Sequence, residues 1–116
     1  MVYIRTIRYK SDTFNLTTTN ITTVLTCPSD ATVIVKNIEA VHNTASNVDT
    51  DLLIRKSGAG ADVQIAHKQM NKETFNFALA TINLEASDIL KMQADTANEI
   101  SGLISYALID RSQENG

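Results

Sequence analysis

Residues 31–43 read ATVIVKNIEAVHN, and the spacing of their apolar side chains decides the fold class. Side chains alternate between the two faces of a β-strand. Val33 and Val35 therefore share one face of a strand, whereas Ile38 and Ala40 have the opposite parity. The apolar face changes phase at the Lys-Asn pair between them, which predicts a long strand interrupted by a bulge or a bend between sheets.

Period-two alternation continues on both sides of this stretch and indicates strands throughout. The segments 49–57 and 62–70, joined by a glycine-containing turn, predict a hairpin. In 73–85 we expect one strand with Phe75, Phe77 and Leu79 on a single face. The apolar residues on both faces of 99–110 indicate a central or doubly covered strand. Further strands are expected at 13–17, 20–28 and 88–95.

About eight short strands at spacings of roughly 8–12 residues, with no amphipathic helix, predict an all-β antiparallel β-sandwich, of which the jelly roll is one form. The 116 residues suit one domain. We divide the chain into a basic N-terminal arm or edge strand (1–10), a single sandwich domain (11–110) and a polar C-terminal tail (111–116).

Composition excludes several functional classes. The net charge of −3 and the absence of a strongly basic block argue against wholesale nucleic-acid binding. No stretch approaches the roughly 20 apolar residues of a membrane span, and the first residues do not resemble a signal peptide. We therefore expect synthesis in the cytoplasm and no membrane partner. One cysteine, Cys27, allows no intrachain disulfide.

No constellation of residues predicts catalysis, a cofactor or a metal ion. His42 and His67 are far apart in the sequence and lack zinc-ligand spacing, so we interpret them as surface or interface polar residues. Cys27 has no activating partner visible in the sequence and is expected to be a small buried residue. The acidic run 49–51 lacks the glycine and distal glutamate of a calcium loop, and we expect it to be solvated. The sequence predicts that the protein is not an enzyme.

Residues 18–47 (TTNITTVLTCPSDATVIVKNIEAVHNTASN) and 84–110 (LEASDILKMQADTANEISGLISYALID) carry a resemblance to a known group of proteins. Over most of residues 11–110 the chain resembles the small β-sandwich virion structural proteins of tailed bacteriophages, namely capsid cement or decoration proteins and short tail or fibre modules. The resemblance concerns the sandwich framework, and it does not separate these two kinds.

The resemblance implies a non-enzymatic homotrimer in the virion, made in the host cytoplasm, that clamps neighbouring subunits of the major capsid protein. A tail, neck or fibre component is the alternative, and a carbohydrate- or ligand-binding module is a third. Within the N-terminal segment, where Tyr and Arg favour protein contacts, we expect the contacts to lie at Tyr3, Ile4, Arg5 and Ile7.

Overall fold

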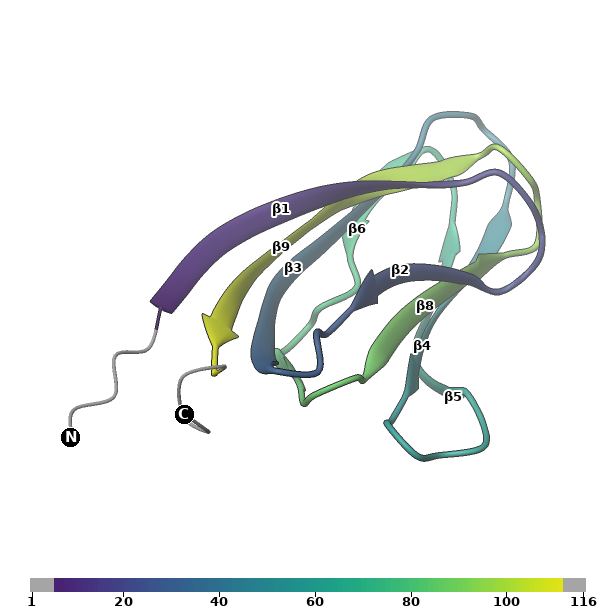
Figure 1. Ribbon diagram of the computed structural model, residues 1–116. Coiled ribbons are helices and arrows are strands. Elements are labelled where there is room, and N and C mark those ends of the chain that lie inside the picture. The colour runs from purple at the N-terminus through teal and green to yellow at the C-terminus, as the bar shows by residue number, and fades with distance from the viewer. Residues whose placement is uncertain (1–5, 112–116) are drawn as a thin grey trace, which may run out of the picture.

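The computed structural model describes residues 6–111, and these form two antiparallel sheets that pack face to face (Figure 1). One sheet has the order β1-β9-β3-β6, with β7 also paired to β3, and the other has the order β2-β8-β4-β5. No helix long and apolar enough to cross a membrane occurs in residues 6–111. The strands are β1 (Thr6–Leu16), β2 (Thr22–Thr26), β3 (Ala31–His42), β4 (Val48–Arg55), β5 (Val63–Met70), β6 (Glu73–Asn76), β7 (Ile82–Leu84), β8 (Ile89–Ala94) and β9 (Ile100–Asp110).

The change of phase predicted within residues 31–43 is confirmed in β3. Val35 and Ile38 are both fully buried although their parities differ. The pairing of β3 with β9 shifts register between Val35 and Asn37, so one residue of β3 lacks an opposite partner. This bulge turns the apolar side chains of both halves of β3 toward the same core.

The predicted all-β sandwich, the hairpin β4–β5 and the central position of the last strand are also confirmed. β9 lies between β1 and β3 and pairs with both. Its inner face contributes Ile100, Ile104 and Tyr106 to the core. Because both of its backbone edges are occupied, β9 joins the N-terminal strand to the rest of the sheet.

The prediction of a single strand at residues 73–85 is wrong, because this segment forms two separate strands, β6 and β7, which brings the strands of residues 6–111 to nine. The side chain of Asn76 accepts the N–H of Ile38 (2.9 Å) close to the β3 bulge, and the carbonyl of Ile38 accepts the N–H of Phe77 (2.9 Å). The chain then leaves the sheet before it returns as β7. Phe77 is buried as expected, but Leu79 lies in the connection and is 76% exposed.

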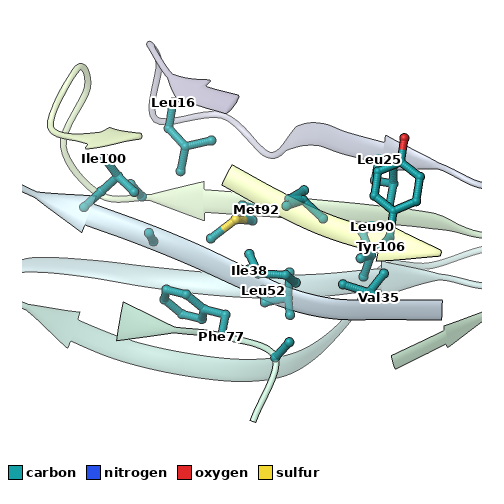
Figure 2. Packing of buried hydrophobic residues seen from close by; sticks show 14 of the residues in the cluster. Leu16, Leu25, Val35, Ile38, Leu52, Phe77, Leu90, Met92, Ile100 and Tyr106 are labelled. Carbon is teal, nitrogen blue, oxygen red and sulfur yellow. The ribbon is translucent and has the colours of Figure 1, made fainter. Parts of the chain in front are cut away.

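The core lies between the sheets and draws side chains from both of them (Figure 2). Leu52, Leu90 and Met92 of the second sheet face Val35 and Ile38 of the first. Phe77 meets Phe75 edge to face, with ring centroids 4.9 Å apart. Burial of these side chains is the main source of stability, because residues 6–111 contain only one cysteine and no disulfide.

A buried carboxylate connects two loops at one end of the sandwich. Asp88, 1% exposed, accepts the backbone N–H groups of Ser57 (2.9 Å) and Glu85 (2.8 Å) and an ion-pair contact from Lys56. Burial alone would raise the pKa of Asp88, but these donors outweigh it and hold the pKa below its usual value. The loops β4–β5 and β7–β8 are therefore fixed to each other by a charged group.

Candidate protein interaction surface

Of the four predicted contact residues, only Ile7 is within the described residues, where it lies at the start of β1. Ile7 is 55% exposed and is opposite Ile109 of β9. Tyr3, Ile4 and Arg5 lie outside residues 6–111, so their expected role stays a prediction. Residues 6–10 of the expected arm or edge strand form the first half of β1, and β1 is an edge strand of its sheet.

The outward-facing side of this sheet carries apolar side chains beside Ile7. Directly opposite residues on antiparallel strands share a face, and the register places Ile7 opposite Ile109 and Tyr9 opposite Ala107, which in turn is opposite Ile34. Tyr9 is 82% exposed, whereas Ile34 and Ile109 are half-buried. We call Ile7, Tyr9, Ile34 and Ile109 the outer apolar strip. A strip of this composition favours protein contact, because exposed apolar side chains that lie together are stabilised when a partner covers them.

The inward-facing side of β1 changes character along the strand. Leu16 is buried and Phe14 packs against the core, but the next residues on that face, Asp12, Lys10 and Arg8, are exposed. A groove of about 350 Å³ separates this charged part of β1 from β2 and is lined by side chains of both strands and of β9. In Figure 1 the first half of β1 extends past β2 and accompanies the end of β9. Among the strands of residues 6–111, the first half of β1 is therefore paired with β9 alone.

Tyr106 lies at the end of the core, beside the charged part of β1. Its hydroxyl donates a hydrogen bond to Oδ2 of Asp12 (2.8 Å). Burial of the ring and the hydrogen bond with Asp12 together raise the pKa of Tyr106 to about 12. The phenol therefore stays neutral over the physiological range, and its hydrogen bond leaves the second oxygen of Asp12 for another partner.

The two histidines occupy different environments, and the expectation that both are surface or interface polar residues is wrong for His42, which is buried within the fold. The His42 ring is 1% exposed, and its Nε2 donates to the carbonyl oxygen of Ser46 (2.6 Å). His42 occupies the last inward position of β3, where backbone carbonyls replace water. His67 is exposed and lies 2.5 Å from Asp51, and this hydrogen bond raises the pKa of His67.

The other residues considered as candidates for a site make contacts within the fold. Asp49 and Asp51, expected in a solvated loop, lie on β4, where Asp51 contacts His67. Cys27 is buried as expected, and burial, together with the negative charge of Asp88, raises the pKa of its thiol. In residues 6–111 no group of three or more His, Cys, Asp and Glu side chains is arranged to hold a metal ion.

Sequence reasoning singled out Ile7 but left Tyr9, Lys10 and Asp12 out of the contact set. The signal was present in residues 7–12, where apolar or small side chains at odd positions alternate with charged ones at even positions. Both faces of a strand with this pattern can meet a partner. In residues 6–111, Tyr9 is the one exposed aromatic side chain, so this part of the chain has no platform of stacked rings of the kind that binds sugars or bases.

Comparison with known proteins gives a match of fold alone. No protein-family model matches the chain, and no curated protein matches it. The chain is similar to one in the acid-stable capsid structure of Helicobacter pylori bacteriophage KHP30, with a TM-score of 0.58 and 10% identity, over 94% of this chain and 95% of that one. The two chains therefore share a fold from end to end.

Two further similarities are weaker and carry no argument. One is to Bacillus endospore appendages, described as disulfide-linked pili, with a TM-score of 0.49 and 12% identity over 94% of this chain and 91% of that one. The other is to a pentameric capsid protein from metagenomic phage sequences, with a TM-score of 0.44 and 15% identity over 90% of this chain and 63% of that one.

Proposed function

We propose that this chain is a non-enzymatic virion structural protein of a tailed bacteriophage, and specifically a capsid cement or decoration protein that clamps neighbouring capsid subunits. The observation that supports this most is the end-to-end match of fold with a chain of a phage capsid structure, which covers 94% of one chain and 95% of the other. A match of this extent relates the fold over nearly the full length of both chains.

The topology supports the same assignment, and we propose that the sandwich is a jelly roll. If β6 and β7 are counted as one interrupted strand, the sheets have the orders β1-β9-β3-β6 and β2-β8-β4-β5. All connections between these eight strands except β4–β5 cross from one sheet to the other. Double-sheet jelly rolls of eight strands form the domains of many viral capsids.

The proposed mode of action is binding through surface, in a homotrimer that sits on the capsid. A domain of 116 residues has a small core and gains stability when copies bury surface against one another. The outer apolar strip provides surface of this kind, and we propose that Tyr3, Ile4, Arg5 and Ile7 contact the major capsid protein. Ile7 supports this because it is exposed and adjoins Tyr9.

The decisive experiment is to find the copy number and position of this chain in purified particles, by quantitative mass spectrometry and cryo-electron microscopy. We expect many copies arranged with the symmetry of the capsid. A few copies at the tail, neck or fibre would replace the cement function with the alternative virion role. Absence from the particle would overturn the proposal as a whole.

A second experiment tests the contact residues. Deletion of residues 1–10 should abolish binding to capsids that lack this protein, while residues 11–110 retain the strands β2 to β9. Ile7→Asp in the full chain is the milder companion change, because an exposed position tolerates the substitution. Unchanged capsid binding by both variants would show that the contact lies elsewhere.

A further inference from the structure

The edges of the two sheets differ in their capacity to accept another strand. In residues 6–111, β2 has five residues and a register shift against β8, β5 has a shift against β4, and β6 and β7 have four and three residues. Short and irregular edges resist pairing with another chain. β1 is neither short nor irregular: its eleven residues pair with β9 without a shift, and nine of the eleven are exposed. Its protection is the charge of Arg8, Lys10 and Asp12, which deters a partner strand unless that strand carries complementary charges.

We infer that the free edge of β1 pairs antiparallel with the free edge of β1 in a second copy of this chain, with Ser11 on the two-fold axis. The contact is isologous, because the same strand serves on both sides. It joins the first sheets of two copies into one continuous sheet through backbone hydrogen bonds that need no particular sequence. The side chains of β1 then determine the register.

Charge complementarity selects the axis at Ser11. That axis sets Lys10 of each copy opposite Asp12 of the other, which gives two opposite-charge pairs. An axis at Lys10 would set two lysines against each other, and an axis at Tyr9 would set Lys10 against Arg8. An axis at Asp12 would oppose two carboxylates. Among these neighbouring registers, only the axis at Ser11 has no like-charge pair directly opposite.

Other contacts on β1 agree with this register. Tyr9 is set opposite Thr13, a pair of aromatic and β-branched side chains that stabilises sheets, and Arg8 is set opposite the ring of Phe14. The hydroxyl of Tyr106 occupies only Oδ2 of Asp12, so Oδ1 can accept Lys10 of the second copy. The pairing would thus cover Tyr9, which is the most exposed large apolar side chain of residues 6–111.

This contact is independent of the proposed virion role and of the proposed trimer. A two-fold contact through the edge of β1 covers Tyr9 but leaves Ile34 and Ile109 of the outer apolar strip for a three-fold contact, and copies that make both would form an extended layer. Failure of the capsid experiments would leave the β1 pairing standing. Failure of the experiments below would leave the virion role standing.

Disulfide formation tests the register. Ser11→Cys sets two cysteines opposite each other, within the Cα separation of about 4.4–6.8 Å that a disulfide allows. Gln64→Cys, on the exposed edge of β5, is the control, and Cys27 stays in place because it is buried. Under mild oxidation we expect Ser11→Cys to form covalent dimers at least about tenfold faster than Gln64→Cys. Equal rates would overturn the proposal, as would faster cross-linking of Lys10→Cys than of Ser11→Cys.

Charge reversal tests the energetics without a new covalent bond. Lys10→Glu sets a glutamate opposite Asp12 twice, and we expect self-association to weaken about tenfold in sedimentation equilibrium at low salt. Lys72→Glu, an exposed position outside β1, makes the same change in net charge. Equal weakening by both variants, or none by Lys10→Glu, would overturn the pairing of Lys10 with Asp12.

Discussion

The two halves of the β1–β9 pair share one unbroken register but differ in what surrounds them. At one end, Phe14 and Leu16 of β1 lie over the core, and Gly102 of β9 lets the Phe14 ring approach the backbone. At the other end, residues 6–12 of β1 lie beyond the core and expose almost every side chain. The same ladder of backbone hydrogen bonds therefore holds a core segment at one end and an exposed segment at the other.

The difference shows that backbone pairing and side-chain burial are separable within one strand. Burial fixes the core half, since loss of apolar contacts there costs several kcal/mol. The projecting half is held by its ladder with β9, and its side chains contribute little to the fold. Those side chains are thus available for a partner. Substitutions in the core half should therefore lower stability, whereas substitutions in the projecting half should weaken assembly and leave stability nearly unchanged.

The largest expected effect is at Gly102 in the core half. A Cβ at this position would lie 2.0 Å from the carbonyl oxygen of Glu39 and 2.7 Å from the ring of Phe14. Backbone of a central strand cannot move away cheaply, so Gly102→Ala should lower the free energy of unfolding by about 3 kcal/mol in chemical denaturation. Gly60→Ala has open space around its new methyl group and should be nearly neutral. Equal stability of the two variants would show that the core half is loosely packed.

Asp88→Asn should have the next largest effect, because Asp88 fixes the loops β4–β5 and β7–β8 to each other. Loss of the charged acceptor should cost about 2 kcal/mol. The folded pKa of Asp88 is lowered, so the stability that it contributes is complete above the ordinary aspartate pKa of about 3.9 and is lost as pH falls through the folded pKa.

Thermal melts from pH 7 to pH 2 would check this, because the acid-induced decrease in melting temperature should be smaller in Asp88→Asn than in the parent. Asp30→Asn, at an exposed aspartate, is the matched control and should keep the parent's pH profile. A parent-like acid profile in Asp88→Asn would contradict the assignment of this stability to the buried carboxylate.

A smaller effect is expected at Tyr106, where the two halves meet. Tyr106→Phe removes the hydrogen bond with Asp12 and should cost about 1 kcal/mol. The pKa of Tyr106 is raised to about 12, so its contribution is complete below about pH 10 and is lost as pH rises from there toward 12. Urea unfolding at pH 8 and pH 11 would measure both. The difference between Tyr106→Phe and the parent should shrink at the higher pH, and a growing difference would refute it.

The smallest effect on stability is expected at Ile7 in the projecting half. Ile7→Ala should change the free energy of unfolding by less than about 0.5 kcal/mol, since the side chain is 55% exposed. Leu16→Ala on the same strand, where the side chain is 1% exposed, should cost about 3 kcal/mol. Similar losses in the two variants would remove the contrast between the halves.

Sequence periodicity predicted much of the fold, because the odd or even position of a residue in a strand decides whether its side chain lies on the buried or the exposed face. The reversed parity around residues 36–37 predicted the bulge in β3, and two apolar faces predicted the central position of β9. The edge position of residues 6–10 followed from their charges. These are local patterns. Each predicts the structure correctly because one face of each sheet must pack against the core.

Other features depended on neighbours that are distant in sequence. The break between β6 and β7 arises because Asn76 bonds to Ile38 beside the β3 bulge, a contact across 38 residues. His42 is buried because the carbonyl of Glu99, 57 residues away, lies 3.3 Å from its ring and completes the surroundings begun by the nearby carbonyl of Ser46 at 2.6 Å. Leu79 is exposed although it continues the alternation of Phe75 and Phe77. Alternation cannot report where a strand leaves the sheet.

By itself the sequence determined that apolar and polar residues alternate along this chain and that it folds as a β-sandwich. It also determined that the single cysteine leaves no intrachain disulfide, and that charged and apolar residues alternate in the N-terminal segment. Only the tertiary structure decided which of those alternating side chains are covered. Parity assigns a residue to a face, but burial requires a second sheet above that face. The second sheet ends at β2, whereas β1 extends past β2, so no second sheet covers the first half of β1.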